Sequence, residues 1–104
     1  MKNSEIKFQV DLDENSFPKS IKWDASDKEG AGMEDTKSIS LNVWDNQNHS
    51  TLRIDLWTEE MSVVEMKRFY IDILGGMAQT ILNSTADEYM SEEIKELCDR
   101  LVKH

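Results

Sequence analysis

The side chains in this sequence that could carry out acid–base or metal chemistry are few and scattered. The two histidines are His49, inside a polar turn, and His104, at the last position, and the single cysteine is Cys98. A zinc site needs four such ligands at defined spacings. Neighbouring side chains on a strand diverge, so Ser50 and His49 cannot act as a nucleophile and its base. The sequence therefore predicts no catalytic residue, no metal ligand, no cofactor and no enzymatic activity.

The charge of the chain limits its partners. Asp and Glu number 21 against 12 Lys and Arg, which gives a formal net charge of −9. An acidic surface repels nucleic acid and anionic lipid, so we expect neither as a partner. A carboxylate pair for acid–base catalysis is an alternative that so many acidic residues produce by chance, but solvated surface carboxylates are the simpler interpretation. Two interpretations of the negative charge stay open: it attracts a basic protein partner, or it serves solubility alone.

Three side chains are better suited to contacts with another protein: Trp44, Arg53 and Trp57. They lie in the stretch from Lys37 to Trp57, where apolar and polar residues alternate on either side of a polar turn at 45–50. This alternation predicts two antiparallel strands. Because a one-residue slip would turn one strand's apolar set to water, we expect residues 43, 41 and 39 to pair with 52, 54 and 56. The predicted core-facing set is Ile39, Leu41, Val43, Leu52, Ile54 and Leu56.

The same parity places Trp44, Arg53 and Trp57 together on the opposite face of this hairpin. Trp and Arg are favoured anchors at protein interfaces, so we predict that these three residues bind a partner. The alternative is that each tryptophan folds over one end of the sheet, because the two lie about 20 Å apart along the strands. Two copies stacked antiparallel through this face would bring Trp44 of one near Trp57 of the other, so a homodimer is a further candidate.

Two further strands are expected before the hairpin. Apolar alternation over residues 6–12, and again at Ile21 and Trp23, predicts them. The acidic, glycine-containing segment Asp24 to Thr36 lacks periodicity and predicts a mobile loop. Its oxygen ligands do not follow the EF-hand spacing, so we expect no calcium site there.

Two helices are expected after the hairpin. Ser62 with Glu65, and Thr85 with Glu88, each form the sequence pattern of a capping box, and apolar residues at spacings of three and four follow both. Within the first helix, Gly75-Gly76 predicts close packing against a neighbouring element. On the second helix, Glu96 and Arg100 have the spacing of an ion pair.

Strands grouped before helices predict an α+β fold. We expect one domain over residues 1–104, with a four-stranded antiparallel sheet followed by two C-terminal α-helices packed on one face. The first 15 residues are polar and charged where a signal peptide needs an apolar run. No stretch approaches the ~18 apolar residues of a membrane span. We therefore expect a cytoplasmic protein that does not insert into a membrane.

Several segments together resemble the GldC family of gliding motility proteins. The most specific is TLRIDLWT at residues 51–58, followed by Met61 and Glu65-Met66-Lys67. Further similarity lies in Ser4–Ile6, Leu12–Asn15, Pro18 with Ile21 and Trp23, and Val43–Asp45. The resemblance implies a small soluble accessory component of the gliding apparatus of Bacteroidetes, a system linked to a protein-secretion machine, and it brings no catalytic motif.

From this resemblance we expect a non-enzymatic, protein-binding adaptor whose partner is a protein of the gliding or secretion machinery. The alternative is a chaperone-like binder of secretion clients of the SecB type. That alternative rests on fold analogy alone, because four strands followed by two helices do not determine a function.

Overall fold

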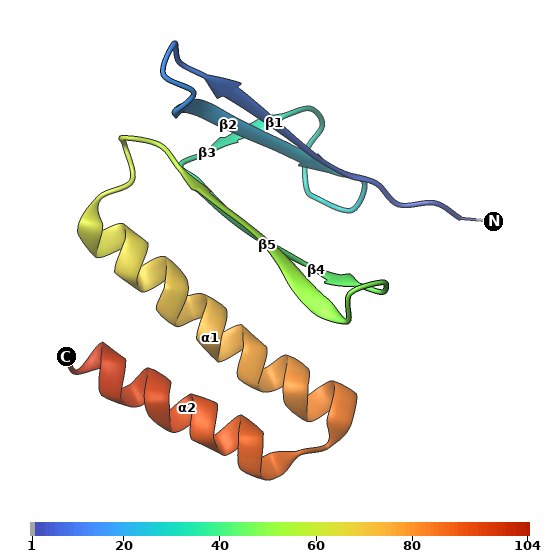
Figure 1. The fold of residues 1–104 in the computed structure, drawn as a ribbon, viewed down its shortest axis with the longest axis vertical. Coiled ribbons are helices and arrows are strands. Elements are labelled where there is room, and N and C mark those ends of the chain that lie inside the picture. Colours follow the sequence, from blue (N-terminus) through green and yellow to red (C-terminus); the bar gives the residue numbers. More distant parts are fainter. Residues whose placement is uncertain (1) are drawn as a thin grey trace. The chain divides into compact units, whose positions relative to one another are not determined.

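A computed structural model describes residues 2–104 and contains five strands followed by two helices (Figure 1). The strands are β1 (Ile6–Leu12), β2 (Pro18–Ala25), β3 (Glu34–Thr36), β4 (Ser38–Asp45) and β5 (Ser50–Trp57), and the helices are α1 (Val63–Thr85) and α2 (Glu88–Val102). The α+β class with two C-terminal helices is thus confirmed. The strands and the helices form two compact units that divide between residues 61 and 62. A single domain over residues 1–104 stays a prediction, as does the packing of the helices on the sheet.

The strands form two sheets, so the prediction of one four-stranded sheet is wrong. One sheet has the order β1-β2-β3, and the other is the hairpin β4-β5. The reason lies in β3, which pairs with β2 from Ile21↔Thr36 to Trp23↔Glu34. Since β1 already occupies the other edge of β2, neither edge of β2 is left for the hairpin strands.

The three-stranded sheet holds the best-buried large side chain of the strand unit. In the β1–β2 register Phe8 pairs with Trp23 and Val10 with Ile21. Partners in an antiparallel pair share a face, so these four residues form one apolar side, as their alternation predicts. Ile21 is only 1% exposed, and this sheet is therefore anchored at the middle of β2.

The hairpin has the predicted register but not the predicted core. Val43 pairs with Leu52, Leu41 with Ile54, and Ile39 with Leu56. Ile39 is 9% exposed, whereas Val43, Leu52 and Ile54 are 50, 58 and 41% exposed. Burial thus falls from the base of the hairpin toward its turn. The assignment of Val43, Leu52 and Ile54 to the core is wrong, because a two-stranded ribbon has no further strand to cover its outer half.

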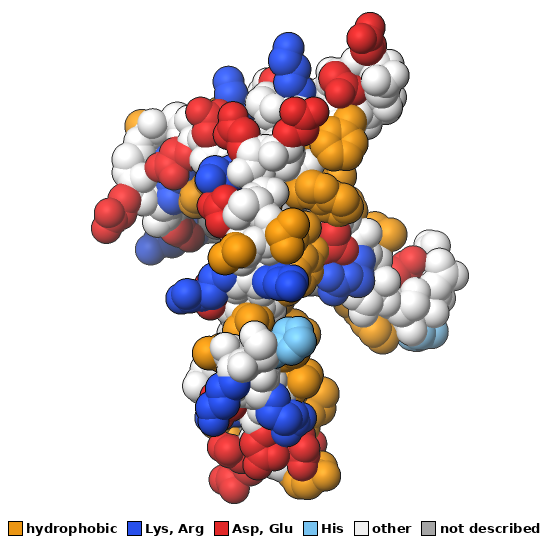
Figure 2. Space-filling view, turned by 90° about the vertical axis from the view of Figure 1, so that its left-hand side faces the viewer, with side chains coloured by type: hydrophobic (Ala, Val, Ile, Leu, Met, Phe, Trp, Pro, Cys, Tyr) orange, Lys and Arg blue, Asp and Glu red, His pale blue; other side chains and the backbone are white. Residues whose placement is uncertain are grey.

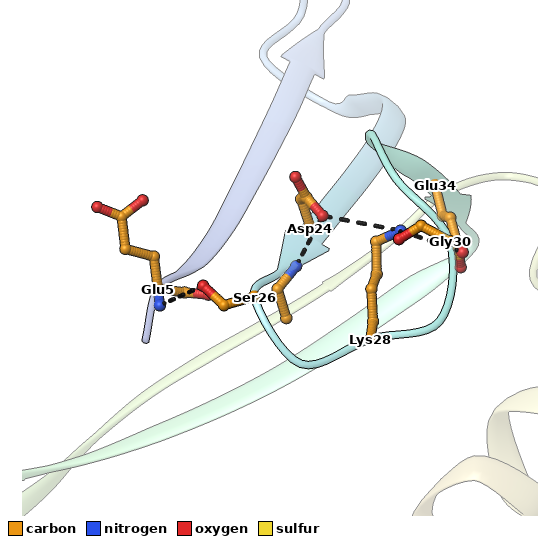
Figure 3. A network of polar contacts seen from close by, with 7 residues as sticks. Glu5, Asp24, Ser26, Lys28, Gly30 and Glu34 are labelled. Carbon is orange, nitrogen blue, oxygen red and sulfur yellow. Dashed lines mark hydrogen bonds and ion pairs between the residues drawn. The ribbon is translucent and has the colours of Figure 1, made fainter. Parts of the chain in front are cut away.

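The acidic segment 24–36 is held by one lysine, and its two ends belong to strands β2 and β3 (Figure 3). Lys28 Nζ lies 3.7 Å from a carboxylate oxygen of Asp24 and 3.3 Å from one of Glu34. It also lies 5.9 Å from the Trp23 ring centroid, a cation–π distance. The Lys28 side chain is 6% exposed. A cation between two carboxylates fastens the turn between β2 and β3, so the prediction of a loop over the whole segment is wrong.

Helix α1 begins as its sequence predicts. The Ser62 hydroxyl accepts the Glu65 backbone N–H at 3.1 Å, and the Glu65 carboxylate accepts the Ser62 backbone N–H at 3.2 Å. This reciprocal capping box satisfies two amides that lack partners inside the helix. Within the helical unit nothing lies within 4 Å of a Cβ placed on Gly75 or Gly76, so α2 does not pack closely against them.

Helix α2 has a different cap from the predicted one. Thr85 is the last residue of α1, and its hydroxyl donates to the Ile81 carbonyl oxygen. Asp87 caps α2 instead, accepting the Met90 backbone N–H at 2.9 Å. The prediction of a capping box from Thr85 and Glu88 is therefore wrong. The reason is that the hydrogen bonds of α1 continue as far as Thr85.

Candidate functional site

One face of the hairpin carries a connected set of polar side chains. In the observed register Asn42 pairs with Arg53 and Ser40 with Asp55. The Arg53 guanidinium donates to the Asn42 side-chain oxygen at 2.7 Å and to the two Asp55 carboxylate oxygens at 3.0 and 3.3 Å. The Ser40 hydroxyl donates to Asp55 at 2.8 Å. Arg53 is thus held in place by its own strand and by the neighbouring one.

The two predicted tryptophans stand at opposite ends of this polar face. Trp44 pairs with Thr51 near the turn, and Trp57 pairs with Ser38 at the base. Trp44 is 59% and Trp57 45% exposed. The three predicted partner-binding residues therefore share one face, as expected, but the fold does not bring the tryptophans together. Six residues of strand, about 20 Å, separate them.

A small hollow adjoins Trp57 and adds residues that the sequence analysis did not assign to the site. Its volume is about 110 Å³, and its lining is Phe17, Pro18, Asp55, Leu56 and Trp57. Phe17 is 38% exposed. Two aromatic side chains from distant parts of the sequence thus border one concave spot. In the sequence, Phe17-Pro18 indicates only a turn or the start of a strand, and nothing local to it points to Trp57.

The opposite face of the hairpin is apolar and partly open. Val43, Leu52 and Ile54 expose about half of their surface there, and the charged residue of β4 and β5 that has the parity of this face is Asp45, at the turn. On the side of the molecule that Figure 2 shows, hydrophobic side chains reach the surface between acidic and basic ones. The hairpin therefore offers two chemically different exposed faces, one polar with tryptophans and one aliphatic.

The turn between β4 and β5 is held by a carboxylate. Backbone N–H groups of Asn48 and Gln47 donate to Asp45 at 3.2 and 2.9 Å, and the Asn48 side-chain amide donates to its other oxygen at 2.9 Å. These bonds, led by the Asn48 backbone amide, lower the pKa of Asp45 from its ordinary value of 3.8. The lowered pKa thus reflects the hydrogen bonds that hold the turn, whose residues 46–49 are exposed.

Across residues 2–104, no cluster of three or more His, Cys, Asp and Glu side chains has a geometry that could hold a metal ion. Within the same residues, neither helix combines the length and apolar character that crossing a membrane requires.

The fold and the exposed hairpin define a small α+β protein whose most distinctive surface residues are of the types used in protein contacts. Residues 18–104 match the family described as gliding motility-associated protein GldC-like. The chain therefore belongs to the GldC-like family, as the resemblance indicates. The match begins at the first residue of β2 and includes the whole hairpin and both helices. No curated protein and no solved structure matches the chain.

Proposed function

We propose that this protein is a cytoplasmic, non-enzymatic adaptor of the gliding motility machinery that binds a protein partner through the polar face of the hairpin. Membership of the GldC-like family supports the association with gliding. The observation that carries the binding role is Trp57, which is 45% exposed beside the hollow that it shares with Phe17. An exposed tryptophan beside a concave spot is the kind of residue that anchors a protein interface.

The polar groups of this face give the partner a defined template. Arg53 is oriented by Asn42 and Asp55, so it loses little further conformational freedom when a partner binds. Preorganised side chains raise affinity by lowering this entropic cost. An apolar side chain of the partner fills the hollow at Trp57, and an acceptor group meets the N–H groups that Arg53 keeps open to water.

The test is capture of an identified component of the gliding or secretion machinery from gliding cells. Wild-type protein is compared with Trp57→Ser, Trp44→Ser and the double variant. Tyr89→Ser on α2 is the matched control, because Tyr89 is an aromatic residue that is 76% exposed and lies outside the hairpin. We expect the largest loss of capture for Trp57→Ser, a smaller one for Trp44→Ser and none for the control. Unchanged capture by a folded double variant would contradict the proposal.

The chaperone-like alternative, a SecB-type binder of secretion clients, draws on the aliphatic face. Val43, Leu52 and Ile54 there are 41–58% exposed, and exposed apolar surface is what a binder of unfolded chains presents. A chaperone would slow the aggregation of an unfolded client, and Leu52→Ser would abolish that effect while leaving Trp57-dependent capture unchanged. The two candidates thus depend on opposite faces of the same hairpin.

A further inference from the structure

Helix α2 presents two different sides. Ser91 and Cys98 are seven residues apart and so lie on one side of the helix. The Ser91 hydroxyl donates to the Ala78 carbonyl oxygen at 2.8 Å, and Cys98 Sγ lies 3.8 Å from the Ile71 carbonyl oxygen. These two small residues therefore face α1.

A row of larger apolar residues lies beside this contact. It consists of Met90, Ile94, Leu97 and Leu101, at successive spacings of four, three and four. This spacing is the a/d pattern of a coiled coil. Met90, Leu97 and Leu101 are 46, 38 and 36% exposed, and Ile94 is half-buried. We call these four residues the α2 seam; it is an apolar stripe that α1 covers only in part, since Leu101 borders a hollow with Tyr70 and Ile71 of α1.

Two opposite charges flank the seam on the side away from α1. In the heptad that places Ile94 at a and Leu97 at d, Glu93 and Arg100 occupy g, while Ser91 and Cys98 occupy e. Among residues 2–104 neither Glu93 nor Arg100 has an ion-pair partner, and the predicted pair Glu96–Arg100 does not form; the α2 pair that does form is Lys95–Glu92. The flanking charges are therefore free for an interaction outside the chain.

We propose that the α2 seam is the dimer contact of this protein, on which α2 of a second copy lies antiparallel. Antiparallel coiled-coil packing pairs a with d, so Ile94 opposes the partner's Leu97 and Met90 opposes the partner's Leu101. In this register each g residue lies beside a g residue of the other helix. Glu93 thereby meets the partner's Arg100, and Arg100 meets the partner's Glu93.

The register that pairs the apolar seam residues also pairs Glu93 with the partner's Arg100. For this reason we propose a second copy of the chain and not a different partner. A two-fold contact must be complementary to itself, and one acidic and one basic g residue a heptad apart meet that condition only in the antiparallel arrangement. This contact lies on α2, so variants of the seam test the dimer without changing the hairpin surface proposed for the adaptor. The two proposals can therefore fail separately.

The seam is short, and this sets the expected strength. Fifteen residues of α2 span about 22 Å, and two heptads bury less surface than the ~1,200 Å² of a standard stable interface. We expect a dimer that forms reversibly and dissociates on dilution and, because of its ion pairs, also in high salt.

The test is sedimentation equilibrium of the full chain with charge-reversal variants. Glu93→Arg and Arg100→Glu each replace two attractive contacts per dimer by two repulsive ones, so each should raise the dimer dissociation constant about tenfold or more. The double variant Glu93→Arg/Arg100→Glu restores the opposite-charge contacts and should return the constant to near that of the wild type.

Matched controls change the same charge away from the seam. Asp99→Arg and Lys103→Glu lie at f and c of the same heptad and should leave the dissociation constant unchanged. Circular dichroism confirms that each variant is folded. A wild type that stays monomeric at every concentration, single variants that dimerise normally, or a double variant that is not restored would each overturn the proposal.

Discussion

The β4–β5 hairpin and helix α2 both expose an arginine beside a carboxylate-bearing residue, yet they use the charges differently. On the hairpin, Arg53 is bound to Asn42 and Asp55 of its own chain. On α2, Glu93 and Arg100 form no ion pair within residues 2–104. A charge already paired adds shape and orientation to a surface, whereas an unpaired one can supply new pairing energy to a partner. In the proposed adaptor the hairpin therefore relies mainly on its tryptophans, whereas in the proposed dimer α2 adds ion pairs to its apolar seam.

The largest expected effect is on the free energy of unfolding. It distinguishes a buried residue of the strand unit from an exposed residue of the hairpin. Ile21→Ala should cost about 2–5 kcal/mol of unfolding free energy, because Ile21 is 1% exposed and its removal leaves a cavity. Ile54→Ala should cost about 1 kcal/mol, because Ile54 is 41% exposed and loses less burial. Urea unfolding measures both, and equal costs would contradict an open aliphatic face.

The same experiment tests the single domain. All three tryptophans lie in strands, and both helices lack tryptophan, so fluorescence follows the strand unit and circular dichroism at helical wavelengths follows α1 and α2. Coincident transitions are expected for one cooperative domain. Two separated midpoints would show that the strands and helices unfold independently.

A smaller effect tests the difference between paired and unpaired arginines directly. Arg53→Ala should destabilise the protein by about 1 kcal/mol, since Asp55 and Asn42 lose their hydrogen bonds to the guanidinium. Arg100→Ala should change stability by less than about 0.5 kcal/mol in dilute solution, where it has no partner to lose. Thermal unfolding at low protein concentration compares the two. A cost for Arg100 equal to that for Arg53 would show that α2 uses its charge within the chain.

The smallest effect concerns the end of the hairpin that carries Trp44. Because hydrogen bonds lower the folded-state pKa of Asp45, its contribution to stability is present above the unfolded pKa and is lost as pH falls through the folded one. Wild type should be more stable than Asp45→Asn at neutral pH, and this difference should shrink below about pH 4. A difference independent of pH would mean that the charge of Asp45 does not support the turn.

Much of the strand arrangement follows from local pattern. Apolar residues at odd positions of one strand and even positions of the next allow one register that keeps both sets on one face, and Val43 does pair with Leu52. Ser62 with Glu65 likewise forms its cap from residues three apart. The shared face of Trp44, Arg53 and Trp57 follows from the same parity.

Other features depend on residues that the sequence does not place side by side. The short, acidic strand β3 has no alternation to reveal it, yet by pairing with β2 it separates the sheet into two. Thr85 has the sequence pattern of a cap, but α1 continues through it and Asp87 takes the role. In both cases a tertiary or neighbouring hydrogen bond competes with the local signal.

The sequence by itself determined the α+β class, the hairpin register, the start of α1 and the family, because each rests on spacings that the backbone geometry converts directly into faces and caps. Only the tertiary structure decided which parts of those faces are buried. Alternation assigns Ile39 and Ile54 to the same side equally, but one is 9% and the other 41% exposed. The hollow between Phe17 and Trp57 has the same origin, since burial depends on which distant segments meet.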